Sequence, residues 1–213
     1  MSFLKRIFGD SVNEMPVKAS LSNADKNEKV ADDPVLFAEW VSEYIVLGVS
    51  FDMDWDHAPN EEQCQRLNIS EKERRLCANE FVLLRALGAC MFVRANLDEK
   101  YYLVFRKSLM PEVIERMDRN SPHMHHDNPS DALDQYLDDL KSESHIDFSM
   151  TYLDRVYPDT PSAGGILAQG IPVLVGLEEA TLILKHTQDG YCKLKFGVDY
   201  ETLQKLHNLS NET

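Results

Sequence analysis

A long apolar segment near the middle of the chain constrains the fold more than any other feature. Between Ser70 and Ala95, apolar side chains occupy much of the circumference of the expected helix. Such a helix must be covered by neighbours on several sides. Ser70 and Glu73 have the spacing of a capping box, which indicates where the helix begins. The segment therefore predicts a bundle in which other helices surround this one.

Proline-containing boundaries predict further helices. Asp33 before Pro34 has the pattern of an N-cap followed by a proline in the first turn, and Asn128–Pro129 repeats it. We therefore expect a mainly α fold, a single domain of about six or seven helices over residues 33–213.

Three segments of this domain have less regular patterns. Residues 101–110 suit a helix or a short strand, after which Pro111 is expected to restart a helix through Met117. Proline and glycine predict a loop over residues 158–172, and Asp199 is expected to begin a last short helix.

The segment 180–196 allows two structures. Asp189–Gly190 is a strong turn signal, and Cys192, Leu194 and Phe196 alternate with lysines, which favours a short C-terminal β-hairpin. A helix over residues 173–186 that ends at the same turn fits equally well.

The first 32 residues predict a flexible leader. Residues 1–9 form an amphipathic tip, with four apolar side chains on one face of a two-turn helix: Phe3, Leu4, Ile7 and Phe8. Residues 10–32 are polar and small, which is typical of a linker. Such a tip suits docking on a partner or on a membrane surface.

Charge indicates what kind of partner the chain can bind. The chain has 36 Asp and Glu against 22 Lys and Arg, a net charge of -14, and a basic segment over residues 74–119 lies between two acidic ones. The acidic balance makes nucleic acid an unfavourable partner, because such binding depends on cations that contact phosphate. The simplest use of the basic residues is pairing with the acidic segments on either side.

The expected helix over 129–141 combines an apolar face with an acidic one, and the acidic side chains are Asp131, Asp134, Asp138 and Asp139. With no enzyme signature in the sequence, we expect a non-enzymatic cytosolic interaction protein (an inhibitor, immunity, adaptor or chaperone-like factor) whose acidic face binds a basic protein partner. The alternative is a peripheral membrane factor anchored by residues 1–9.

A histidine-rich segment suggests a second alternative. His123, His125, His126 and Asp127 are ligand types for a divalent metal such as zinc, although such runs bind metal adventitiously too. The pair His126–Asp127 is similar to the dyad of the HD-type phosphohydrolases, which implies a metal-dependent phosphohydrolase. In that family the dyad usually sits in an apolar helix, whereas here it lies between a His/Met stretch and Asn-Pro. No other cofactor is expected.

The cysteines and the apolar runs bear on location. The four cysteines form no C-x-x-C pair, which indicates reduced thiols in a cytoplasmic protein. No apolar run approaches the roughly 18 residues of a membrane-spanning helix. We expect a cytoplasmic location, with the tip allowing attachment to the inner face of the membrane.

Overall fold

Eight α-helices make up the part of the chain that the computed structural model describes, which is residues 21–46, 62, 65–66, 70–120, 129–141, 145–156 and 166–211. No strand occurs in these residues. The helices are α2 (Leu21–Asp32), α3 (Pro34–Val46), α5 (Glu71–Asn96), α6 (Glu99–Asn120), α7 (Pro129–Lys141), α8 (His145–Val156), α9 (Ile166–Phe196) and α10 (Tyr200–Asn211). The prediction of a mainly α fold is confirmed.

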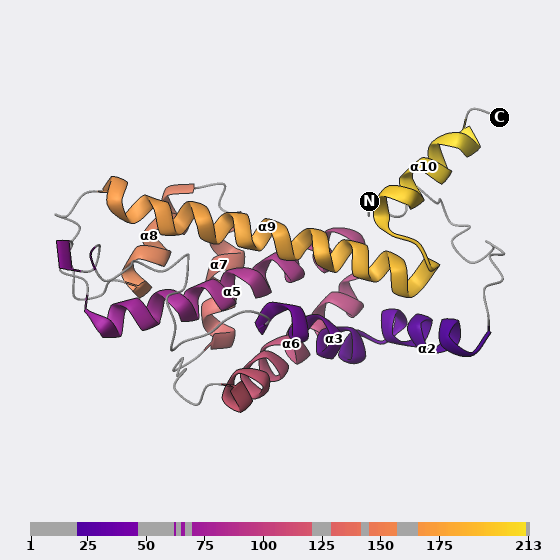
Figure 1. Cartoon of the computed structure of the whole chain (residues 1–213), viewed down its shortest axis with the longest axis horizontal. Coiled ribbons are helices and arrows are strands. Elements are labelled where there is room, and N and C mark those ends of the chain that lie inside the picture. Colours follow the sequence, from indigo (N-terminus) through magenta and orange to yellow (C-terminus); the bar gives the residue numbers. More distant parts are fainter. Residues whose placement is uncertain are drawn as a thin grey trace.

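Helix α5 is the centre of the bundle, as its apolar circumference predicted (Figure 1). Every residue from 79 to 90 is buried, and the helix contacts α3, α6, α7, α8 and α9. The capping box at its start is present, because the Ser70 hydroxyl accepts a hydrogen bond from the Glu73 amide at 3.2 Å while the Glu73 carboxylate accepts one from the Ser70 amide at 2.8 Å.

The longest helix, α9, lies along α5 and runs in the same direction (Figure 1). The two backbones come close at Gly88, where a Cβ atom would overlap the carbonyl group of Ala180. Nearby, Arg85 Nε donates to Glu179 Oε2 at 2.8 Å and an Arg85 guanidinium nitrogen donates to the Ile45 carbonyl at 3.0 Å. A glycine at the crossing and a buried ion pair beside it therefore join α5 to α9.

Aromatic side chains fill the space between α3, α6 and α9. The Phe37 ring lies 5.6 Å from that of Phe105 and 5.5 Å from that of Tyr191, measured between centroids. Helix α3 starts as predicted, since the Asp33 carboxylate accepts a hydrogen bond from the Val35 amide at 2.9 Å. Phe37, four residues after this cap, is fully buried in the core.

The predicted C-terminal hairpin is wrong, and so is the alternative in which a helix ends at Asp189–Gly190. Helix α9 continues through this pair to Phe196. Gly190 lies under the indole of Trp40, whose ring a Cβ atom would overlap. The glycine thus permits a close helix contact rather than a turn. The residue that follows the helix is Gly197, whose φ of 75° is the left-handed conformation that glycine adopts just past helix ends.

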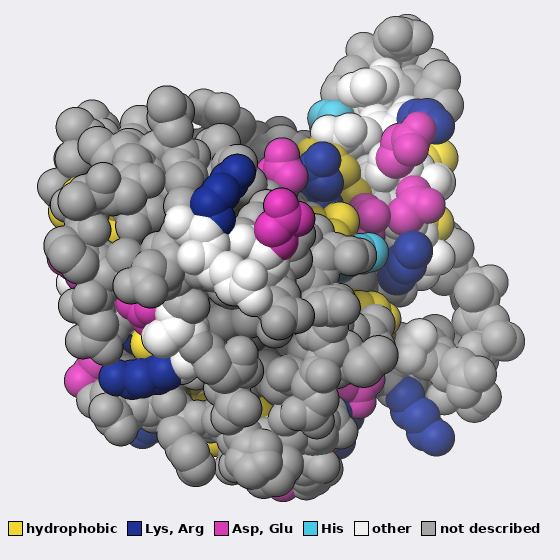
Figure 2. Space-filling view, turned by 60° about the vertical axis from the view of Figure 1, so that its left-hand side comes forward, with side chains coloured by type: hydrophobic (Ala, Val, Ile, Leu, Met, Phe, Trp, Pro, Cys, Tyr) yellow, Lys and Arg dark blue, Asp and Glu magenta, His cyan; other side chains and the backbone are white. Residues whose placement is uncertain are grey.

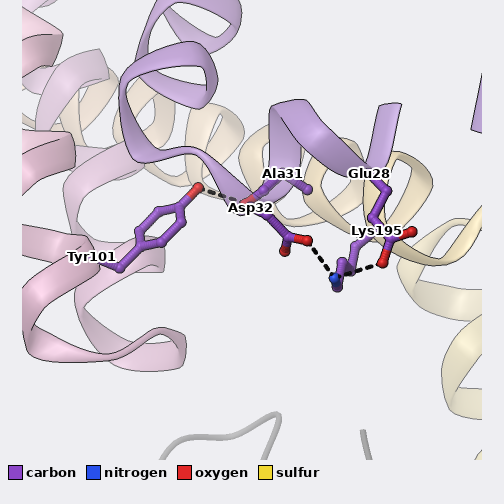
Figure 3. Close-up of polar contacts among 5 residues, drawn as sticks. All are labelled: Glu28, Ala31, Asp32, Tyr101 and Lys195. Atoms are coloured by element: carbon purple, nitrogen blue, oxygen red, sulfur yellow. Dashed lines mark hydrogen bonds and ion pairs between the residues drawn. The ribbon is translucent and has the colours of Figure 1, made fainter. Parts of the chain in front are cut away.

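The predicted linker also needs correction where the structure describes it. Residues 21–32 form α2, which packs on α9 and α3. Tyr101 donates a hydrogen bond to the Ala31 carbonyl at 2.7 Å, and Lys195 Nζ donates to Glu28 and Asp32 at 2.9 and 2.8 Å (Figure 3). Few apolar residues suffice for α2 because polar contacts to α6 and α9 hold it.

Two further boundaries differ from prediction. No new helix begins at Pro111, because this residue lies inside α6, which is continuous. The proline is exposed, and Leu109 and Val113 on either side of it are buried. The predicted loop over 158–172 is described from Ile166 on, where α9 has already begun. The final helix from Asp199 is confirmed, since the Asp199 carboxylate accepts a hydrogen bond from the Thr202 amide at 2.8 Å.

Candidate interaction groove between α6 and α7

Helices α6 and α7 both pack on α5, and two adjoining hollows of about 290 and 330 Å³ lie between them. We call the two hollows together the α6–α7 groove. The first is lined by Leu103, Arg106, Lys107, Met110, Ser130, Leu133 and Asp134. The second is lined by Arg94, Glu99, Tyr102, Leu103, Arg106, Asp134, Leu137 and Asp138.

An ion pair crosses this groove. The Arg106 guanidinium contacts the carboxylate of Asp134, and both residues line both hollows, so the pair lies where the hollows meet. Partial burial lowers the pKa of Arg106, but the hydrogen bond and charge of Asp134 outweigh it and leave this pKa raised. The pair is partly exposed, with 32% and 39% of the two side-chain surfaces accessible to solvent.

Three of the predicted acidic side chains form a row on α7. Asp131, Asp134 and Asp138 are spaced by three and four residues, which places them on one side of a helix. We call them the acidic row. Asp131 and Asp138 are exposed and Asp134 is half-buried; Asp131 and Asp138 also take part in interactions within the chain.

Asp139 does not belong to this row. Five residues after Asp134, it lies about 140° away around the helix at about 100° per residue. It is half-buried, and its charge contributes to the raised pKa of Tyr136. The structure therefore brings three of the four predicted residues together and turns the fourth to another side of α7.

A buried polar network positions α7 and α8. The Glu80 carboxylate of α5 accepts a hydrogen bond from the Tyr136 hydroxyl at 2.6 Å and one from Arg155 Nε at 2.8 Å. Burial, above all, raises the pKa of Tyr136, and the Glu80 charge adds to this. Sequence analysis missed this network, although a glutamate within an apolar helix signals that a buried partner is needed.

The pairing expected of the basic segment is present. Arg116 pairs with Glu43 of the preceding acidic segment at 3.3 Å, and Arg106 pairs with Asp134 of the following one. Arg85 instead pairs at 2.8 Å with Glu179, which lies beyond both acidic segments. Among the described side chains that are visible in Figure 2, acidic and basic ones lie near one another.

The other predicted site residues lie outside the described residues. These are the amphipathic tip (Phe3, Leu4, Ile7 and Phe8) and the histidine-rich segment (His123, His125, His126 and Asp127). The membrane and phosphohydrolase alternatives rest on them and stay predictions. Within the ranges that the structure describes, no three His, Cys, Asp or Glu side chains are placed to share a metal ion. No helix in the same ranges has the length and apolar character needed to cross a bilayer.

Comparison of the chain with protein-family models, with curated proteins and with solved structures finds no match in any of the three.

Proposed function

We propose that this protein is a non-enzymatic interaction protein whose acidic row on α7 binds a basic protein partner. The observation that carries the proposal is the place of the row, two of whose three members line the α6–α7 groove. Asp134 and Asp138 line the hollows, and Asp131 is exposed one turn before Asp134. Carboxylates beside an open groove can meet the cations of a partner.

The electrostatics agree with such a role. Complementary charge at an interface raises the association rate and selects the partner more than it adds affinity. The net charge of -14 also attracts a basic partner over a range set by the ionic strength. Binding is therefore expected to weaken as salt is added.

Charge reversal within the acidic row tests the proposal. The variant D131K/D138K changes two exposed carboxylates, and its control E39K/E178K changes two exposed carboxylates on α3 and α9 by the same net charge. Each immobilised chain is incubated with cell lysate at low and at high salt, and bound proteins are identified and quantified by mass spectrometry.

At low salt, we expect the native chain and E39K/E178K to capture the same basic proteins. D131K/D138K should capture at least about tenfold less of them, which corresponds to a loss of about 1.4 kcal/mol in binding free energy. High salt should release the same proteins. If all three chains capture one set in equal amounts, binding does not involve the acidic row and the proposal fails.

A further inference from the structure

The second hollow of the α6–α7 groove contains opposite charges that do not pair with each other. Arg94, in the last turn of α5, and Glu99, in the first turn of α6, both line it, yet no ion pair joins them. Within the described residues, neither side chain has an ion-pair partner elsewhere. Opposite charges that line one hollow without meeting leave room for a ligand between them.

The Tyr102 hydroxyl is a further group of this hollow that has no partner in the described part of the chain. Tyr102 lines the hollow, and only 5% of its surface is exposed. Its hydroxyl forms no hydrogen bond with the residues that the structure describes, and the Arg94 guanidinium lies 6.0 Å from the centroid of its ring. Because a buried tyrosine hydroxyl usually has a hydrogen-bond partner, this one can take its partner from a ligand.

The charges of the hollow act on this hydroxyl. Burial, above all, raises the pKa of Tyr102, while the charges of Arg106 and Arg94 lower it and the charge of Asp134 raises it. All three charged residues line the same hollow. The hydroxyl therefore lies close to the charged side chains that a ligand would meet there.

We infer that the second hollow binds a small zwitterion, an α-amino acid with an apolar side chain. The ligand carboxylate accepts hydrogen bonds from the Arg94 guanidinium and the Tyr102 hydroxyl, and its ammonium group donates to Glu99. The inference does not depend on the proposed function, because none of these three residues belongs to the acidic row.

The charges of the hollow require both ends of such a ligand. It is lined by two arginines and three acidic residues (Arg94, Arg106, Glu99, Asp134 and Asp138), of which Arg106 and Asp134 pair with each other. An anion would face Glu99 and Asp138, and a cation would leave Arg94 without a counter-charge. A zwitterion meets both signs, and hydrogen bonds between charged groups are stronger than neutral ones.

The size of the hollow agrees with a ligand of this class. Its volume of about 330 Å³ is at the lower end of the range of about 300–1,000 Å³ that is typical of small-molecule sites. Leu103 lines both hollows and exposes 52% of its surface, whereas Leu137 is buried. Leu103 is thus the apolar surface that an aliphatic side chain of the ligand can cover, and leucine is a suitable probe.

Leucine and two truncated analogues test the inference. Isoamylamine is leucine without the carboxylate, and isocaproate is leucine without the ammonium group. Each is titrated into the isotopically labelled full chain, and backbone amide shifts in NMR spectra give the affinity and the location. We expect leucine to bind at least about tenfold more tightly than either analogue, because each analogue loses a charged contact. The shifts should lie at the end of α5, the start of α6 and the end of α7.

Two single variants remove the ligand contacts. R94Q should weaken leucine binding about tenfold and Y102F severalfold. Their controls are K185Q, which removes an exposed charge on α9, and Y44F, which removes an exposed hydroxyl on α3; both should bind leucine as the native chain does. Because the Tyr102 hydroxyl has no partner among the described residues, Y102F should also keep the native free energy of unfolding in urea, which separates a ligand contact from a structural one.

The inference is overturned if leucine causes no shifts at this hollow, if either analogue binds as tightly as leucine, or if R94Q and Y102F both bind leucine as the native chain does. Equal binding of isoamylamine and leucine would mean that the net charge of -14 attracts any small cation. None of these variants changes the acidic row, so the capture of basic proteins tests the proposed function separately.

Discussion

Single glycines decide how closely the helices of this protein approach each other. Gly88 on α5 faces the backbone of α9, and Gly190 on α9 faces the ring of Trp40 on α3. Inside a helix, glycine is less favourable than alanine by about 1 kcal/mol. Both positions accept this cost because any Cβ atom would enter space that a neighbouring helix occupies.

The variant G190A should therefore destabilise the protein, although alanine favours the helix. Overpacking against Trp40 costs about 1–3 kcal/mol, and the gain in helix propensity offsets about 1 kcal/mol of it, so we expect a net loss of up to about 2 kcal/mol. The measurement is the free energy of unfolding in urea.

The same change in a W40A background serves as the control. Without the indole, the alanine has room, and G190A should become stabilising by up to about 1 kcal/mol. A loss of equal size in both backgrounds would mean that Trp40 is not the obstacle. G88A should be destabilising in either background, because its obstacle is the backbone at Ala180.

At the scale of an element, α2 shows how a polar helix can belong to the fold. Ala31 is fully buried, but most of the described side chains of α2 are exposed. Its position depends on the Tyr101 hydroxyl and on Lys195, which contacts Glu28 and Asp32 on successive turns (Figure 3). These contacts come from α6 and α9, so the helix is held only once both are in place.

Removal of the Lys195 charge should make α2 open more often, and the other helices should be little affected. In K195Q, amide hydrogen exchange over residues 26–32 should become about fivefold faster, because partly exposed ion pairs contribute about 1 kcal/mol at most. K193Q, which changes an exposed lysine of the same helix, should leave the exchange unchanged. Equal exchange in both variants and in the native chain would show that Lys195 does not hold α2.

The pH dependence of this contact has a definite sign. Partial burial lowers the pKa of Lys195, but the hydrogen bonds and charges of Asp32 and Glu28 outweigh it, so this pKa is raised above its ordinary value of 10.5. A raised pKa means that the stabilisation is present below pH 10.5 and is lost as the pH rises through the folded-state value. K195Q should lack this alkaline loss.

At the scale of the whole molecule, the core excludes solvent from two cysteine thiols that form no disulfide. Cys90 on α5 and Cys192 on α9 are free and buried. Burial, above all, raises the pKa of both thiols to about 12. Because the thiolate is the reactive form, each is protected by its pKa as well as by the surrounding helices.

Cys90 and Cys192 should therefore resist iodoacetamide at pH 8 in the native protein and react in step with global unfolding in urea. Peptide mapping by mass spectrometry locates the modified residue, and circular dichroism follows unfolding in the same samples. Rapid modification of Cys90 under native conditions would mean that α5 opens without unfolding of the bundle.

Capping residues and helical spacing in the sequence determined where several helices begin and which residues share a side of a helix, because both depend only on residues a few positions apart. The capping box at Ser70, the Asp33–Pro34 start of α3 and the cap at Asp199 all form as predicted. Three of the four predicted acidic residues on α7 form one row for the same reason, because helical spacing alone places them.

Only the tertiary structure decided the features that join distant segments. Asp189–Gly190 has the residues of a turn, yet packing against Trp40 makes it part of a helix. The α6–α7 groove and the Arg106–Asp134 pair depend on where α5 holds two separate helices. Spacing along the chain determines which side of a helix a residue occupies. Which other helix that side meets depends on how the complete core packs, and the sequence of one segment does not contain that information.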